Sequence, residues 1–342
     1  MFAPLLEKLH RREDLTAEEA SAAMAEIMDG RAQPAQIAGF LVALGMKGER
    51  PSEIVGLARA MRARATKLSR TFAPVFDTCG TGGDRAHTFN VSTLSALVLA
   101  AAGIRVAKHG NRSVSSRCGS ADLLEALGVN IAAPPEVVER CLDQAGIAFF
   151  FAPTFHPSMR HAAPARKELG IRTAFNLLGP LTNPAGAARQ LVGVPRPELT
   201  ELVARSLALL GAERAWVVHG ADGLDEISTT GYTKVSECRA GAVNTFYVHP
   251  SDFKLPKAAP ADLRGGDASD NAAIARRVLD GEPGPARDIV LLNAAVSLLI
   301  AGAVTTVPEG MARAAMAIDS GAARGALDRL TTVSNAGAPA RT

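Results

Sequence analysis

The chain has 342 residues, of which 47% are hydrophobic and 21% are charged, with 37 Lys and Arg against 34 Asp and Glu for a formal charge of +3. This length suggests two domains, or one large domain with an appendage, and the composition is that of an ordinary globular protein, not of a disordered or collagen-like chain. The near-neutral charge argues against a dedicated DNA-wrapping protein, and an aromatic content of 4% argues against extensive stacking platforms for single-stranded nucleic acid.

The cysteines indicate a reducing compartment. The four are widely spaced and form no C-x-x-C pair, at Cys79, Cys118, Cys141 and Cys238. This pattern does not indicate a disulfide scaffold, so we expect a cytoplasmic protein. The amino terminus reaches charged residues too early for a signal peptide.

The first 70 residues are predicted to be helical throughout. Thr16 followed by Glu19 has the spacing of a capping box. Pro34 and Pro51 each stand where a further helix can begin. No strand pattern appears before Pro74, so we expect a small helical module at this end of the chain.

From Pro74 the sequence alternates between short apolar strands and helices. Strands are predicted within 73–80, 104–110, 147–152 and 215–220, and helices over 90–103, 120–128, 134–146 and 198–211, with a closing helical region from Arg287. We interpret Ser120 as the cap of its helix. Strands and helices in alternation with short links predict a mostly parallel sheet covered by helices, an α/β fold.

One uncharged stretch, 289–307, is long enough to be tested as a membrane span. It contains polar residues, and Gly302 has the place of a helix stop. We therefore expect a buried helix followed by a loop, and no membrane association.

The strongest local signal is the glycine-rich segment DTCGTGGD at 77–84, which we call the donor loop, between a predicted strand and a predicted helix. Glycines let the backbone pass close to a ligand, and the start of the next helix offers unpaired N–H groups. Asn90, Ser92 and Thr93 stand at that helix start, where they could cap the helix or hold a phosphate. The spacing is neither a Rossmann nor a Walker A motif.

A second segment, KHGNRSVSS at 108–116, is rich in hydrogen-bond donors. It ends the next predicted strand and therefore lies at the same sheet edge. Lys108 and Arg112, with the hydroxyls of three serines, supply the cations and donors that bind phosphoryl oxygens. A phosphorylated small molecule is the ligand we expect.

An acidic segment follows a late strand and contains Asp222, Asp225 and Glu226. Carboxylates beside a phosphate site can hold Mg²⁺, which takes oxygen ligands and commonly bridges substrate phosphates. Ser92 could supply a further oxygen. The sequence therefore predicts a magnesium-dependent site for a charged phosphate compound.

The order and spacing of six motifs resemble the anthranilate phosphoribosyltransferase family: GTGGD, TFNVST, KHGNRSVSS, GSADLLEALG, RKELGIRTAFNLLGPLTNP and HGADGLDEIS. The resemblance extends over nearly the whole chain, to RDIVLLNAA and GMARAAMAIDSGAA, and only the region around 240–280 carries no motif. It implies a transferase that moves the phosphoribosyl group of phosphoribosyl pyrophosphate to the amine of anthranilate, the second step of tryptophan biosynthesis from chorismate.

The resemblance also implies the site. The donor would be held by Gly80, Gly83, Asp84, Thr88, Asn90, Val91, Ser92, Thr93, Lys108, His109, Gly110, Asn111, Arg112, Ser113, Val114, Ser115, Ser116 and Ser120. Anthranilate would contact Gly80, Asn111 and Arg166, with Arg166 facing its carboxylate. Mg²⁺, two ions per subunit, would be bound by Ser92, Asp225 and Glu226.

The implied architecture is a small helical domain over 1–70, joined by part of 155–185, and a large α/β domain over 71–342 of the nucleoside phosphorylase and phosphoribosyltransferase type. The family is a homodimer formed through the small domain. One departure is Arg85, which stands where the family usually has glycine and could contact phosphate or stiffen the turn.

The chemistry needs no covalent protein nucleophile, and the sequence offers no convincing Ser–His or Cys–His dyad. We assign no proton transfer to His109. A pyrimidine nucleoside phosphorylase is an alternative with a similar fold, but such proteins are longer and carry another phosphate signature. A non-catalytic nucleic-acid-binding relative is a second alternative, and Asp225, Glu226 and the small net charge argue against it.

Overall fold

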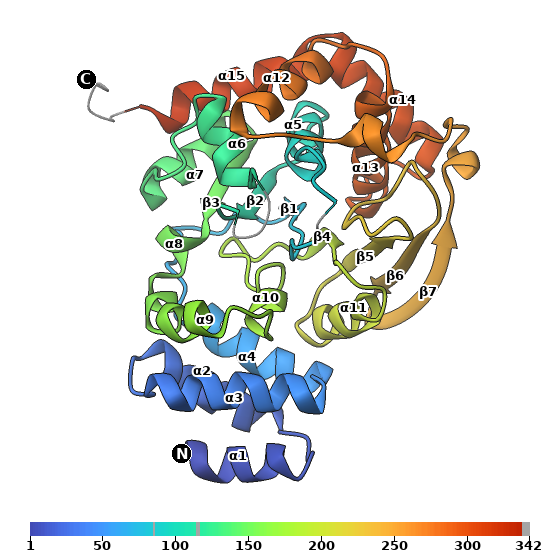
Figure 1. Cartoon of the computed structure of the whole chain (residues 1–342). Coiled ribbons are helices and arrows are strands. Elements are labelled where there is room, and N and C mark those ends of the chain that lie inside the picture. Colours follow the sequence, from blue (N-terminus) through green and yellow to red (C-terminus); the bar gives the residue numbers. More distant parts are fainter. Residues whose placement is uncertain (85, 114–116, 337–342) are drawn as a thin grey trace.

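The computed structural model describes residues 1–84, 86–113 and 117–336. Figure 1 shows a helical bundle at the amino-terminal end, a sheet in the middle and carboxy-terminal helices on the side away from the bundle. The expected α/β class is confirmed: a helical bundle domain is joined to a large domain with a mostly parallel sheet.

The bundle contains α1 (Phe2–His10), α2 (Ala17–Met28), α3 (Pro34–Lys47) and α4 (Pro51–Ala63). The predicted capping box is present at the start of α2, where Thr16 Oγ1 accepts from the Glu19 N–H at 3.1 Å and Glu19 Oε2 accepts from the Thr16 N–H at 3.0 Å. Pro34 and Pro51 open α3 and α4 as predicted, because proline at the first helical position loses no hydrogen bond.

In the described part of the chain, the sheet has seven strands in the order β3-β2-β1-β4-β5-β6-β7. Their bounds are β1 (Phe76–Asp77), β2 (Val106–Gly110), β3 (Ile147–Phe151), β4 (Arg189–Gly193), β5 (Arg214–Gly220), β6 (Thr233–Arg239) and β7 (Ala242–Val248). The first five in this order are parallel, and β6 and β7 continue the sheet antiparallel. The predicted mostly parallel sheet is confirmed.

The remaining helices are α5 (Val91–Ala101), α6 (Ser120–Ala126), α7 (Pro135–Gln144), α8 (Ala152–Phe155), α9 (Ala163–Leu169), α10 (Phe175–Leu178), α11 (Leu199–Leu209), α12 (Ala268–Leu279), α13 (Pro285–Ile300), α14 (Val307–Asp319) and α15 (Ala322–Ser334). Three 3₁₀ turns lie at Pro157–His161, Pro250–Phe253 and Pro260–Leu263.

Alternate residues of β4 and β5 face two different hydrophobic clusters, as the two-residue period of a strand requires. Leu191, Trp216 and Val218 belong to the larger cluster, which includes α5, α7 and the carboxy-terminal helices. Val192 and Val217 belong to the second, which they share with α9, α10, α11 and the bundle. The bundle is therefore packed onto one face of the sheet through intermediate helices.

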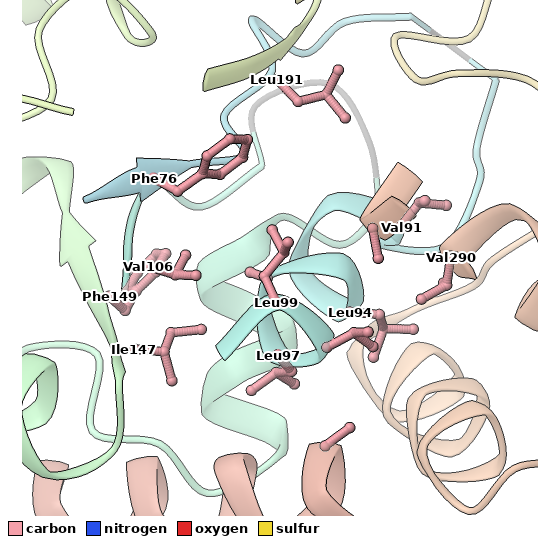
Figure 2. Close-up of a cluster of buried hydrophobic side chains, with 14 of the residues drawn as sticks. Phe76, Val91, Leu94, Leu97, Leu99, Val106, Ile147, Phe149, Leu191 and Val290 are labelled. Carbon is pink, nitrogen blue, oxygen red and sulfur yellow. The ribbon is translucent and has the colours of Figure 1, made fainter. Parts of the chain in front are cut away.

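The larger cluster holds the strand that leads into the donor loop. In Figure 2, Phe76 and Val106 of the neighbouring strands β1 and β2 lie in one hydrophobic cluster with Leu94 and Leu97 of α5. These side chains are at most 1% exposed. Packing of α5 against the strands places its amino terminus beside the end of β1.

Two local predictions were wrong or incomplete. Ser120 is the first residue of α6, and the cap position is Gly119, whose N–H donates to the Asp122 carboxylate at 2.8 Å. Strands β4 and β6 were not predicted, and neither was the antiparallel strand β7, which lies within the region without motifs. It is a sheet edge with mostly exposed or half-buried residues, so its sequence lacks the apolar run of the buried strands.

The stretch 289–307 forms most of α13 and the loop after it, as predicted. Its helical part is buried on nearly all sides, which explains its apolar character. Among the described residues, no helix combines the length and apolarity that a membrane crossing requires.

Candidate functional site

The predicted site segments meet at the carboxyl edge of the parallel strands. β1 lies between β2 and β4, and β5 follows β4 in the sheet. The donor loop after β1, the segment 108–116 at the end of β2 and the acidic segment after β5 therefore emerge at one edge, where α/β folds commonly bind ligands.

Side-chain hydrogen bonds of Asp77 and Lys108 link the end of β1 to β2. Asp77 is buried, and its carboxylate accepts from the His109 N–H at 3.1 Å and from Asn183 Nδ2 at 2.7 Å. Burial raises the pKa of Asp77 to about 6. Lys108 Nζ donates to Thr78 O at 2.8 Å and lies 3.4 Å from Ser92 Oγ. Burial lowers the pKa of Lys108, while nearby carboxylates oppose that effect.

The amino terminus of α5 faces an acidic side chain. Glu226 Oε1 accepts from the Ser92 N–H at 3.1 Å, so a carboxylate occupies the positive end of the helix dipole. The same serine hydroxyl is the one close to Lys108. The structure thus brings Ser92, Lys108 and Glu226 together.

Asp225, Glu226 and Asp84 form an acidic cluster. Burial first, and then the neighbouring Asp84, raise the pKa of Asp225 to about 7. Burial and Asp225 raise the pKa of Glu226 well above its ordinary value, and burial raises that of Asp84. Such mutual repulsion between enclosed carboxylates is relieved by a bound cation.

The chemistry of these residues is compatible with magnesium only in part. Among the described residues, no group of three or more His, Cys, Asp or Glu side chains is arranged to hold a metal ion by itself. Mg²⁺ is commonly held by one or two carboxylates together with substrate phosphates and water, and Asp225 and Glu226 are carboxylates of that kind. Asp222 has another role: its carboxylate accepts from Ser228 Oγ at 2.6 Å and shapes its own loop.

Close backbone packing joins the donor loop to the acidic segment. The Thr81 N–H donates to Gly193 O at 2.9 Å, at the end of β4. A Cβ on Gly80 would lie 2.9 Å from Asp225 Oδ2, and one on Gly193 would overlap the Asp225 carbonyl oxygen. Gly193 is required because the backbones of the strand end and the acidic loop touch, whereas at Gly80 the close neighbour is a side-chain oxygen.

The segment after β2 is organised by α6. Arg112 is exposed and pairs with Asp122 at 2.9 Å and Glu125 at 2.8 Å, and both interactions raise its pKa. The Ser113 N–H donates to Asp122 at 3.1 Å. The Arg112 charge is thus balanced within the protein. Val114, Ser115, Ser116 and Arg85 lie outside the described residues.

Asn111 and Ser120 close the same turn. Ser120 Oγ donates to Asn111 O at 3.4 Å, and Asn111 Oδ1 accepts from the Arg112 N–H at 2.8 Å. A Cβ on Gly110 would overlap Ser120 Oγ, which explains the glycine there.

The predicted residues before and in α5 differ in what they contact. Asn90 makes no cap hydrogen bond; its amide bonds Cys118 O at 3.2 Å and Asn271 at 3.0 Å. Thr88 forms an isolated antiparallel β-bridge with Arg264 through the backbone. The hydroxyl of Thr93 is buried without a hydrogen-bond partner among the described residues, and the side chain of Val91 is buried in the core.

His109 lies beside the α10 segment. Its Nδ1 is 3.0 Å from Gly179 O, and its ring centroid is 5.1 Å from that of His156. Burial lowers the pKa of His109 to about 4, so the ring is neutral near pH 7. The absence of proton transfer by His109 stays a prediction.

Arg166 is on α9, with its guanidinium carbon 5.1 Å from the centroid of the Phe175 ring. Burial lowers the pKa of Arg166. Within the described chain it forms no ion pair. A largely enclosed guanidinium in this state can accept an anionic ligand. No hydrogen bond in the described chain joins Arg166 to the donor loop.

Cys79 and Cys118 are buried thiols. Burial raises the pKa of Cys79 well above its ordinary value and that of Cys118 to about 11. Both thiols are therefore protonated near neutral pH, which argues for packing and against nucleophilic or redox chemistry.

Comparison with known proteins decides the family. The glycosyl transferase family α/β domain matches residues 73–324, and the glycosyl transferase family helical bundle domain matches residues 3–65. The anthranilate phosphoribosyltransferase of Moorella thermoacetica is 58% identical over 331 residues, which cover 96% of this chain and 97% of that protein. The chain belongs to the anthranilate phosphoribosyltransferase family.

Solved members of this family share the fold. The anthranilate phosphoribosyltransferase of Thermus thermophilus superposes with a TM-score of 0.90 at 47% identity, covering 96% of this chain and 99% of that one. The Saccharomyces cerevisiae enzyme, solved in complex with PRPP and Mg, gives a TM-score of 0.89 at 28% identity, with 98% of each chain covered. The same yeast enzyme has been solved with 4-fluoroanthranilate.

Three residues near the site were not predicted from the sequence. Arg172 Nη2 donates to Thr81 O at 3.2 Å across the donor loop. Asn293 on α13 bonds both backbone groups of Ile227, beside Glu226, at 3.0 and 2.9 Å. Asn183 binds Asp77. Each lies within a quoted family motif, but only its folded contacts show its role.

Proposed function

We propose that this chain transfers the phosphoribosyl group of phosphoribosyl pyrophosphate to the amine of anthranilate, giving N-(5-phosphoribosyl)anthranilate and pyrophosphate, in the second step of tryptophan biosynthesis from chorismate. The observation that carries this proposal is the convergence of the donor loop, Lys108 and the acidic pair Asp225 and Glu226 at one sheet edge, in a member of this family.

The donor site we propose has two parts. The glycines and Asp84 of the donor loop, with the amino terminus of α5, approach the sugar phosphate and diphosphate. The second part is the segment from Lys108 to Ser116 with Ser120. Buried Lys108, held by Thr78 O, supplies a cation that needs no reorganisation when charge develops.

We assign the metal site to Ser92, Asp225 and Glu226, with two Mg²⁺ ions per subunit. When bound, Mg²⁺ would neutralise charge on the departing diphosphate. Glu226 is already oriented by the Ser92 N–H, and the Asp225 backbone is packed against Gly193. The protein's own contribution is to hold these carboxylates in place before substrate arrives.

We assign the anthranilate site to Gly80, Asn111 and Arg166. The enclosed Arg166 guanidinium would face the anthranilate carboxylate and orient its amine. The amine then attacks the anomeric carbon as the diphosphate leaves, so catalysis is positioning and electrostatics. Neutral His109 stays a structural neighbour of this site.

The remaining assignments are also proposals. We place the domain boundary at residue 70, with part of 155–185 joining the helical domain. Helices α9 and α10 share the bundle's hydrophobic cluster, which supports this division.

We propose a homodimer through the helical domain and a cytoplasmic location. Fractionation of cells that produce the tagged chain tests the location.

Anthranilate fluorescence tests the function. Purified protein with phosphoribosyl pyrophosphate, Mg²⁺ and anthranilate should remove the fluorescence, and chelation of Mg²⁺ should stop the reaction. In the same assay, Arg166→Ala should raise the KM for anthranilate by at least about tenfold, the effect of losing one charge-assisted pair, with a smaller change for the donor. No fluorescence loss, with phosphorolysis of thymidine or uridine instead, would overturn the assignment in favour of the phosphorylase alternative.

A further inference from the structure

Arg172 connects two parts of the molecule that are far apart in the sequence. It lies in the link between α9 and α10, helices that share the bundle's hydrophobic cluster. Figure 1 shows these helices between the bundle and the sheet. From there the side chain reaches the donor loop, where Nη2 donates to Thr81 O at 3.2 Å.

The donor loop is shaped to receive this guanidinium. Gly82 and Gly83 both have positive φ, +62° and +82°, so both turns favour glycine. They differ in surroundings: a Cβ on Gly82 would meet nothing within 4 Å, whereas a Cβ on Gly83 would overlap Arg172 Nη1 and lie 2.8 Å from its Cζ. The missing side chain at Gly83 therefore provides the space that Arg172 fills.

The contact has a consequence for the ligand. Thr81 is bonded on its other side to Gly193 O at 2.9 Å, so the loop is held between β4 and Arg172. Gly80 and Asp84 flank this held segment. A loop fixed in its binding conformation avoids part of the ordering cost of binding, and the guanidinium places a positive charge beside the loop.

We propose that Arg172 is a positioning residue for the phosphoribosyl donor, which acts by holding the donor loop through Thr81 and Gly83. This inference rests on the proposed function for the identity of the donor. It assigns the anthranilate side of the site to Arg166 and the donor side to Arg172, two arginines of the same segment with separate tasks.

The first test separates donor from acceptor. Arg172→Ala should raise the KM for phosphoribosyl pyrophosphate by about tenfold or more, as expected for loss of a hydrogen bond from a charged donor. The KM for anthranilate should change by less than about threefold. Arg172→Lys keeps the charge without the planar fork and should recover only part of the loss. An unchanged donor KM in Arg172→Ala, or equal increases for both substrates, would overturn the proposal.

A double-mutant cycle tests the contact itself. Gly83→Ala suffers backbone strain and collision with Arg172, whereas Gly82→Ala is a matched control for strain alone. In the Arg172→Ala background the collision is absent, so Gly83→Ala should raise the donor KM less than it does when Arg172 is present. Gly82→Ala should raise the donor KM by the same factor in both backgrounds. An identical Gly83→Ala effect in both backgrounds would refute the contact.

Direct binding keeps this test independent of the transfer reaction. Calorimetric titration with phosphoribosyl pyrophosphate and Mg²⁺ measures Kd without anthranilate. If the unaltered protein binds the donor but does not use anthranilate, the proposed function fails while the cycle still reports on Arg172. A lowered Tm with unchanged donor Kd in Arg172→Ala would show a merely structural role and would contradict our proposal.

Discussion

Asp225 and Glu226 follow β5 at a place where the surrounding chain encloses both carboxylates. Burial raises both pKa values, aided by repulsion from Asp84 for Asp225 and from Asp225 for Glu226, and Lys108 partly opposes the shift for Glu226. A protein keeps such a cluster at a cost in stability unless a ligand uses it. At the scale of single residues, this enclosed carboxylate pair is the observation behind the magnesium site that we propose.

The proposed magnesium site predicts the effect of neutralising the pair. Asp225→Asn with Glu226→Gln keeps shape but removes two charges, so the Mg²⁺ concentration for half-maximal rate should rise by at least about tenfold. Initial rates over a Mg²⁺ titration measure it. Glu198→Gln, which removes an exposed carboxylate paired with Arg196 at 3.3 Å, is the control and should leave the titration unchanged. An unaltered Mg²⁺ requirement in the double variant would refute the metal assignment.

Helices α2 and α4 cross at close range in the bundle. Gly56 of α4 lies against α2, and a Cβ there would overlap Ala17 O and lie 2.9 Å from Ala20 Cβ. In α3, a Cβ on Gly39 would have its nearest neighbour, Leu6 Cδ2, at 3.7 Å. Glycine is thus required for the close packing of α4 against α2, whereas in α3 the structure has room for an alanine side chain.

This contrast predicts opposite outcomes for one substitution. Alanine gains about 1 kcal/mol over glycine inside a helix, but overpacking costs about 1–3 kcal/mol. Gly56→Ala should therefore lower the free energy of unfolding, and Gly39→Ala should leave it unchanged or raise it. Urea denaturation followed by circular dichroism measures both. Equal stabilisation by the two variants would show that α2 and α4 separate easily.

The elements themselves were largely predictable because local signals suffice for them. Prolines and a capping box marked α2 to α4, and short apolar runs marked the parallel strands β1, β2, β3 and β5. The parallel strand β4 was not predicted. β7 escaped because an edge strand buries neither face fully, so no hydrophobic period develops.

Over the whole molecule, two hydrophobic clusters meet across the sheet and make the bundle continuous with the α/β domain. The bundle also exposes apolar side chains, among them Met46 on α3 at 73%. Met46 therefore serves as a probe of the homodimer that we propose through the helical domain.

Light scattering after size exclusion tests that assembly. We expect a mass twice the 35.5 kDa of one chain. Met46→Glu should weaken the dimer by at least about tenfold, the cost of burying a charge at an interface. Met316→Glu, equally exposed on α14 at 65%, is the matched control and should remain dimeric. A monomeric unaltered chain would contradict the homodimer.

By itself, the sequence determined the α/β class, the helical bundle, the order of the motifs and the family, because these depend on local periodicity, glycine spacing and motif order. Only the tertiary structure decided which side chains meet. Arg172 reaches Thr81 across 91 residues, Arg112 pairs with α6 and not with the sheet edge, and Asn293 braces Ile227 from α13. Such contacts arise from how helices pack around the sheet, which no local pattern records.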